Sequence, residues 1–185
     1  FDDSGDLWIT DESNVWKYDV VKDSLLTIVF HNEIDLGRIR SNALVVDSSG
    51  EIWLCSDKGL WTVRAGEKAF AQVLNIDLAT INIGRSGEII AFSNAGSLLR
   101  ISTDTHSILS QSLSLKQEYL SATGVEIFEN NYILSSDEGI FIFDSTLRNT
   151  DRLTTENSLL SNDHVTGLTV IDNSLYIATF RGIST

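Results

Sequence analysis

Four polar residues stand in loops that a common scaffold could bring to one surface. Arg40 precedes one apolar segment, Asn162 and His164 precede another, and Arg181 lies between two short apolar segments. The side chains of arginine, asparagine and histidine hydrogen-bond to hydroxyl groups, and a guanidinium also pairs with a carboxylate or sulfate through two parallel bonds. These four residues are the candidate ligand-binding residues of the chain.

Neighbouring loops carry further polar or aromatic side chains. The wider set is Arg38, Asn42, Asp57, Lys58, Asn94, Asp137, Glu138, Asp163 and Phe180. Many of these are residue types that turns use to bond their own backbone. Arg40, Asn162, His164 and Arg181 are preferred over this wider set because turn geometry does not require them.

Pairs of carboxylates also recur along the chain, at Asp2-Asp3, Asp11-Glu12 and Asp137-Glu138. A glycosidase or lyase could use two carboxylates for acid–base chemistry. These pairs stand where turns are expected, and aspartate commonly caps the backbone of a turn. We therefore predict no catalytic residues. An acidic pair facing one another across a channel would instead favour a carbohydrate-active enzyme.

Metal and cofactor signals are weak. His31, His106 and His164 are far apart, and none lies at metal-ligand spacing from another histidine or from Cys55. The chain has no glycine-rich phosphate loop and no G-x-S-x-G motif. We therefore predict neither a metal nor a cofactor, and we expect Cys55 to be a buried, inert thiol.

A tryptophan repeat indicates the scaffold that positions these residues. Segments 5–10 and 50–55 share a glycine, an acid, an aliphatic residue and a tryptophan, and a second tryptophan follows each. Trp8 and Trp53 are 45 residues apart, and so are Trp16 and Trp61. A repeat of this length, built from short strands, is typical of a β-propeller with one blade per repeat. We expect the tryptophans to pack between blades rather than to bind a ligand.

Weaker copies extend this register through the chain. The second turn residue of each unit is Asn14, Gly59, Gly96, Gly139 or Gly182, which gives a period of about 42 residues. Glycine and asparagine reach the positive φ that a tight hairpin needs at the least steric cost. Each period reads as four strands, with an apolar inner strand and a weaker outer one.

The sequence therefore predicts an all-β fold. Residues 1–185 form a single β-propeller fragment of about four blades, which starts in the middle of a blade. Four blades could close on themselves, but we expect a larger propeller with further blades flanking both ends. Neighbouring blades or a second copy of the chain would then cover the open faces.

Composition excludes some function classes. The net charge of −13 argues against nucleic acid as a partner, because such binding needs a basic surface. The chain has no run of 18 or more apolar residues, so no membrane-spanning helix is expected.

Two segments resemble a known repeat. Residues 3–10 and 47–54 are similar to the D-x-x-G-x-L-W-I-G-T repeat of two-component regulator propellers, and residues 159–165 to the G-L-S-x-N-x-V stretch before the inner strand of that family. The third and fourth copies depart from it, with Ile90 in place of tryptophan and Tyr132-Ile133 without the preceding Gly-x-Leu.

This resemblance implies a function. It implies a periplasmic sensor region of a hybrid histidine kinase, which detects an oligosaccharide from polysaccharide breakdown. The kinase would lie outside this chain, in a full protein that is membrane-anchored and dimeric. Two alternatives use the same fold: a scaffold for protein interactions and a carbohydrate-active propeller enzyme.

Overall fold

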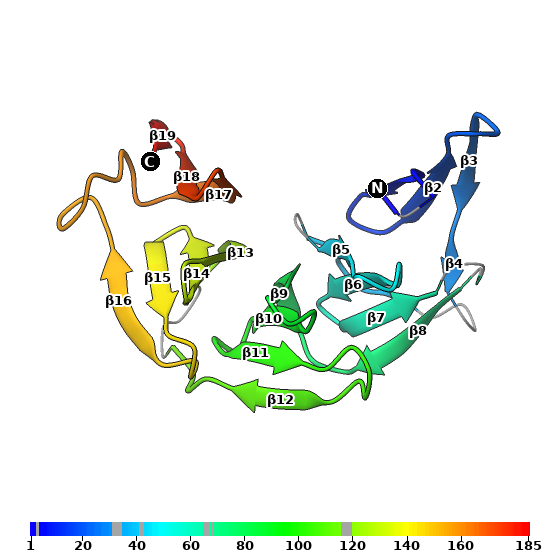
Figure 1. Cartoon of the computed structure of the whole chain (residues 1–185), viewed down its shortest axis with the longest axis horizontal. Helices are drawn as coiled ribbons and strands as arrows, with labels where there is room; N and C mark the ends of the chain where they lie inside the picture. Colours follow the sequence, from blue (N-terminus) through cyan, green and yellow to red (C-terminus); the bar gives the residue numbers. More distant parts are fainter. Residues whose placement is uncertain (3, 31–34, 41–42, 65–66, 68, 116–119) are drawn as a thin grey trace.

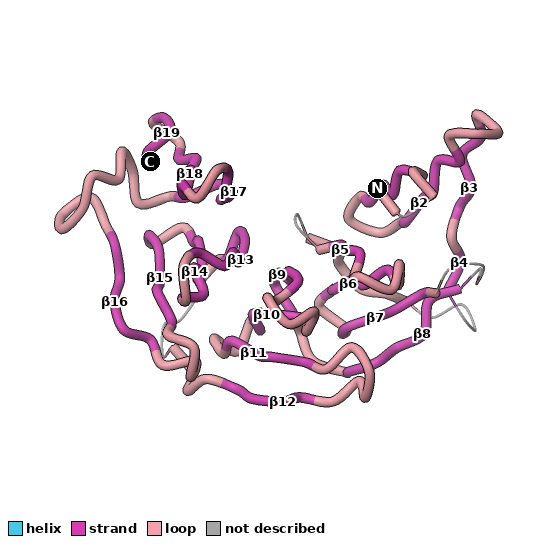
Figure 2. The backbone as a smooth tube through the Cα atoms, in the orientation of Figure 1, coloured by secondary structure: helices cyan, strands magenta, loops and turns pink. Residues whose placement is uncertain are grey.

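The computed structural model describes residues 1–2, 4–30, 35–40, 43–64, 67, 69–115 and 120–185. Within these ranges the chain forms strands and loops and no helix (Figure 2). The strands are β1 (Leu7–Thr10), β2 (Val15–Asp19), β3 (Ser24–Thr27), β4 (Val29–Phe30), β5 (Leu44–Val46), β6 (Ile52–Ser56), β7 (Gly59–Val63), β8 (Ala69–Leu74), β9 (Leu78–Ile83), β10 (Ile89–Ser93), β11 (Leu98–Ile101), β12 (Ile108–Gln111), β13 (Ala122–Phe128), β14 (Asn131–Ser136), β15 (Gly139–Phe143), β16 (Asn149–Leu153), β17 (Val165–Ile171), β18 (Ser174–Thr179) and β19 (Gly182–Ser184). A helix long and apolar enough to cross a membrane is accordingly not found in this described part.

The strands form radial sheets arranged around an open arc. Blade 1 is β1-β2-β3, blade 2 is β5 to β8, blade 3 is β9 to β12, blade 4 is β13 to β16, and blade 5 is β17-β18-β19. Successive strands within each blade pair antiparallel. The inner strands β5, β9, β13 and β17 face the middle of the arc, and the two termini lie at its opposite ends (Figure 1). The β-propeller prediction is confirmed.

The predicted blade number needs a correction. The described strands are spread over five sheets rather than about four, and the first and last sheets have three strands each. The reason is the offset of the repeat. Because β1 is equivalent to a second strand, the described residues supply blade 1 from its second strand onward and blade 5 up to its third strand.

One strand belongs to no repeat. β4 runs from blade 1 to the outer edge of blade 2, where Val29 and Phe30 pair in parallel with Ala69 and Phe70 of β8. Blade 2 therefore has five strands, and the connection between the first two blades is held by backbone pairing. The sequence did not predict this strand.

The core lies between neighbouring blades. Trp53 and Trp61 are 0% and 1% exposed and belong to a cluster that reaches from blade 1 to blade 3. Trp8 packs against the same cluster, with its ring edge-on to Phe70 at 6.3 Å, but it is only half-buried. The predicted packing between blades is thus confirmed for the tryptophans of blade 2.

The structure explains the aspartate of the tryptophan repeat. Asp47 Oδ1 accepts hydrogen bonds from the backbone N–H groups of Ser49 and Glu51, and its Oδ2 accepts the indole N–H of Trp53 at 2.9 Å. Asp2 makes the equivalent bonds in blade 1, including one of 3.0 Å from Trp8. Each carboxylate therefore ties its turn to the tryptophan six residues later.

The ionisation of these aspartates follows from their bonds. Burial alone would raise the pKa of Asp2, but hydrogen bonds from Lys17, Trp8 and the Asp6 backbone outweigh it and lower that pKa to about 2. The pKa of Asp47 is also lowered, because bonds from Ser49 and Trp53 outweigh the effect of burial. Asp11 likewise accepts the backbone N–H groups of its own turn. Asp2, Asp11 and Asp47 are therefore structural turn residues, as predicted. Asp3 lies outside the described residues.

The predicted glycine register is confirmed with one exception. The φ angles of Gly59, Gly96, Gly139 and Gly182 are 148°, 87°, 106° and 135°. Asn14 is not among the residues with positive φ, so that prediction was wrong. Its turn is instead closed by Asp11, whose side chain accepts both the backbone and the side-chain N–H of Asn14.

Candidate functional site

Two sets of loops meet on one face of the arc, here called the loop face. One set enters the inner strands and includes residues 35–40, 75–77, 120–121 and 161–164, and the other joins second to third strands at 57–58, 94–97, 137–138 and 180–181. In each of blades 2 to 5, a backbone hydrogen bond joins the two sets. These bonds are Asp57 N to Arg38 O (3.2 Å), Asn94 N to Asp77 O (3.0 Å), Asp137 N to Ser121 O (3.1 Å) and Phe180 N to His164 O (3.3 Å).

Most charged side chains of the loop face already have partners. Arg38 forms an ion pair with Glu12 of blade 1 at 2.9 Å, and Lys58 pairs with Asp35. Glu138 pairs with Arg152 of β16 at 3.1 Å. These residues hold loops together, which is the role expected of turn residues. Asn42 lies outside the described residues.

Blade 5 departs from this pattern. Phe180 occupies the position that Asp57, Asn94 and Asp137 occupy in blades 2 to 4, and it is 71% exposed. Its ring stacks on the imidazole of His164 with centroids 4.0 Å apart and planes 11° apart. An exposed apolar ring on a polar face is a feature that turn geometry does not explain. We call His164, Phe180 and the adjacent Arg181 the aromatic platform.

The other residues of blade 5 hold this platform in place. Asn162 Oδ1 accepts the backbone N–H of His164 at 3.1 Å, so Asn162 shapes the turn that presents the imidazole. The backbone N–H of Arg181 bonds to Thr179 Oγ1, and the Arg181 side chain is exposed. Three of the four predicted ligand contacts therefore lie together, although Asn162 positions the imidazole instead of standing free.

Arg40 lies apart from the other three. It ends the segment 35–40 of blade 2, and blades 3 and 4 separate it from blade 5 along the arc (Figure 1). Its Nε atom is buried without a hydrogen-bond partner. Burial raises the pKa of the Cys55 thiol to about 12, although the positive charge of Arg40 acts to lower that pKa. Arg40 therefore contributes to the interior of blade 2, and Cys55 is a buried thiol, as predicted.

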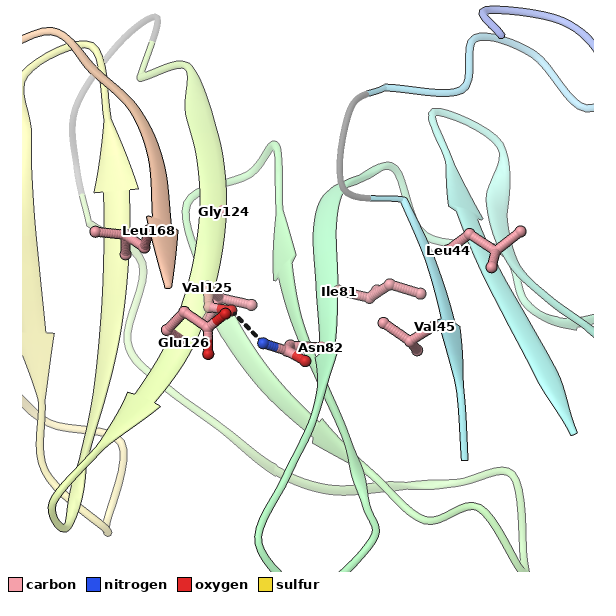
Figure 3. A pocket seen from close by; sticks show the side chains of 8 residues that line it. All are labelled: Leu44, Val45, Ile81, Asn82, Gly124, Val125, Glu126 and Leu168. Atoms are coloured by element: carbon pink, nitrogen blue, oxygen red, sulfur yellow. Dashed lines mark hydrogen bonds between the residues drawn. The ribbon is translucent and has the colours of Figure 1, made fainter. Parts of the chain in front are cut away.

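A cavity lies among the inner strands (Figure 3). Its volume is about 170 Å³, and strands β5, β9, β13 and β17 all contribute to its wall. Asn82 of β9 crosses between two blades to donate a hydrogen bond from Nδ2 to the carbonyl of Val125 at 2.8 Å. The lining residues are Leu44, Val45, Ile81, Asn82, Gly124, Val125, Glu126 and Leu168. This described wall has one carboxylate, whereas the glycosidase chemistry considered above uses two.

A metal centre has no counterpart in the described part of the chain, where no three histidine, cysteine or acidic residues gather as ligands would.

The fold resembles several solved structures. Two structures of the extracellular domain of BT4673 from B. thetaiotaomicron, described in one case as a one-component system and in the other as a hybrid two-component system, have TM-scores of 0.81 and 0.79 at 14% and 15% identity. Each match covers 97% of this chain and 26% or 25% of the solved chain. PorZ of Porphyromonas gingivalis, a surface component of the type-IX secretion system, has a TM-score of 0.72 at 16% identity, covering 99% of this chain and 30% of PorZ.

These matches show a similarity of fold. The chain spans about a quarter to a third of the length of these solved chains. It matches no model of a protein family, and it matches no curated protein sequence. The β-propeller neighbours nevertheless agree with the resemblance to two-component regulator propellers that the repeats indicate.

Sequence reasoning passed over two residues that the geometry singles out. Phe180 belongs to the wider set of loop residues and not to the four preferred contacts. The equivalent position holds a polar residue in blades 2 to 4, namely Asp57, Asn94 and Asp137, and Phe180 interrupts that series. The interruption is visible only when the loops of the blades are aligned in the correct register. Glu126 stands between two apolar residues of inner strand β13, and its sequence neighbours carry no motif that marks it as a site residue.

Proposed function

We propose that this chain is a ligand-sensing β-propeller whose loop face binds an oligosaccharide. The observation that supports the proposal is the exposed stack of Phe180 on His164 beside Arg181. The C–H face of a sugar ring packs well against an aromatic face, and a guanidinium bonds to hydroxyl, uronate or sulfate oxygens. The loops that hold these groups stand on a sheet scaffold, an arrangement that commonly carries binding sites.

The sensory role is part of the same proposal. The neighbours from BT4673 are extracellular domains of signalling systems, and the repeat resembles that of two-component regulators. We therefore propose a periplasmic sensor that detects a polysaccharide breakdown product and signals to a kinase outside this chain, without catalysis of its own. A sensor must bind its ligand with different affinity in two states, so binding should change how neighbouring domains or subunits are arranged.

Alanine substitution on the platform tests this binding site. We expect Arg181→Ala to weaken oligosaccharide binding about tenfold or more, because a hydrogen bond to a charged group contributes about 1.5–3 kcal/mol. Phe180→Ala should weaken binding by a similar factor, because it removes the apolar face against which the sugar ring packs. Calorimetry with a panel of neutral, uronate-bearing and sulfated oligosaccharides measures the effect. Asn162→Ala and His164→Ala should also weaken binding, since they position the stack.

The control for this experiment is Arg148→Ala, which removes an exposed arginine from the turn before β16. Binding that survives every platform substitution, and Arg40→Ala as well, would rule out this site. Cleavage of a glycan that depends on Asp137 or Asp163 would support the enzyme alternative instead.

The end blades also expose apolar side chains. Leu159 and Ile183 at blade 5 are 93% and 72% exposed, and Val21 and Leu25 at blade 1 are 89% and 57% exposed. Exposed apolar surface of this kind marks sites of association. We propose that these surfaces pack against neighbouring blades or a second copy of the chain. This is also the observation that favours the interaction-scaffold alternative.

Self-association can be measured directly. We expect light scattering to report a dimer or larger assembly of the chain at high micromolar concentration. The double substitution Leu159→Asp and Ile183→Asp should shift the chain toward monomer, because a charge cannot be buried there without a partner. The conservative pair Leu159→Val and Ile183→Val serves as the control. A parent chain that stays monomeric would contradict the prediction.

A further inference from the structure

We propose that the cavity among the inner strands binds an organic ammonium ion through the carboxylate of Glu126. This site is separate from the aromatic platform, because it is formed by inner strands rather than by loops. Figure 3 shows the Glu126 side chain beside Asn82, with Ile81, Val45 and Leu44 on the other side of the cavity. Charge, wall chemistry and size each support this class of ligand.

The charge of Glu126 is not balanced within the described residues. The ion pairs found there lie at other positions, and none includes Glu126. Burial raises the pKa of Glu126, while bonds from the backbone of Ile127 and from the Asn82 side chain partly oppose that effect. A half-buried carboxylate with no cationic partner gains most from a ligand that brings a positive charge and N–H donors.

The wall selects an organic cation over a metal ion. Calcium takes about 6 to 8 oxygen ligands, and magnesium requires nearly ideal octahedral coordination. The described wall offers one carboxylate, and Leu44, Val45, Ile81 and Leu168 contribute aliphatic side chains to it. An alkylammonium ion matches both parts, because its head pairs with the carboxylate and its carbon chain contacts the aliphatic side chains.

The size of the cavity limits the ligand. A volume of about 170 Å³ has room for several non-hydrogen atoms. A short primary amine or the amino-bearing edge of a larger molecule has these dimensions. The net charge of −13 further concentrates cations around the protein.

Nuclear magnetic resonance titration of the full chain with n-butylammonium chloride tests the site. We expect saturable shifts at the amides of Asn82, Val125 and Glu126. The uncharged probe n-butanol and the anionic probe sodium n-butyrate should produce no saturable shifts at the same concentrations.

Two variants and a control complete the test. Glu126→Gln keeps the shape of the side chain and removes its charge, so it should weaken n-butylammonium binding at least about tenfold. Leu168→Phe should also weaken binding by filling the cavity. Glu156→Gln removes an exposed charge elsewhere in blade 5's entry loop and should leave the affinity unchanged.

The proposal would be overturned by any of three results. These are the absence of saturable shifts in the parent, equal affinity in the parent and in a well-folded Glu126→Gln variant, and equal binding of n-butanol. An amide spectrum of Glu126→Gln that overlays on the parent away from the cavity establishes that the variant is folded. Because no platform residue is altered, this test is independent of oligosaccharide binding.

Discussion

The variant Gly139→Ala should lose about 2–6 kcal/mol of unfolding free energy. Gly139 has a φ of 106°, and a Cβ atom placed there would lie 2.3 Å from the carbonyl oxygen of Leu153 on β16. The backbone conformation alone costs a non-glycine residue about 1–3 kcal/mol, and relief of the contact costs about 1–3 kcal/mol more. The contact cannot be relieved cheaply, because it involves the backbone of the neighbouring strand.

The chain contains a matched control for this variant. Gly182 has the same repeat position in blade 5 with a φ of 135°, but a Cβ atom there would meet nothing within 4 Å. Gly182→Ala should therefore lose only the conformational part, about 1–3 kcal/mol. Urea denaturation of both variants measures the difference. Equal losses in the two variants would show that β16 does not approach the hairpin between β14 and β15 as closely as described.

The second large effect is expected for Trp53→Ala, at about 3–5 kcal/mol. Trp53 is fully buried between blades 2 and 3, where its ring lies edge-on to His106 with centroids 5.3 Å apart. Its removal leaves a cavity and takes the indole N–H from Asp47, whose carboxylate then loses one of its bonds. Thermal or urea denaturation measures the loss.

Phe180→Ala is the control for the tryptophan variant. It also deletes an aromatic ring, but this ring is exposed, so we expect a change in stability within about 0.5 kcal/mol. The two variants thus separate stability from ligand binding, since Phe180→Ala should affect binding alone. If Trp53→Ala unfolds within about 0.5 kcal/mol of the parent, Trp53 does not carry the packing between blades.

The sequence predicted the fold well because the repeat is visible both in the spacing of the tryptophans and in the positions of the hairpin glycines. The 45-residue spacing of the tryptophans reflects equivalent places beside the core, and the glycines mark hairpins with positive φ. Both are local signals that a single chain displays. The split into five sheets and the parallel pairing of β4 with β8 depend on contacts between distant segments. Local patterns carry no information about either.

The candidate site was predicted less completely. Asn162, His164 and Arg181 lie together because two loops of one blade meet, which the repeat register anticipates. Arg40 was placed in the same set, but its Nε atom is buried in blade 2. The sequence identifies a loop and its polar residues. It does not say whether a side chain turns outward or into the interior, since that depends on packing between blades.

Amide chemical-shift mapping with the oligosaccharide panel tests the proposed binding site most directly. We expect a bound oligosaccharide to shift the amide signals of residues 162–166 and 179–182, while those of the outer strand β12 stay unchanged. The same oligosaccharide should cause no such shifts in the Phe180→Ala variant. A saturable ligand whose shifts cluster away from blade 5, or that shifts the same amides in Phe180→Ala, would contradict the assignment of the aromatic platform as the binding site.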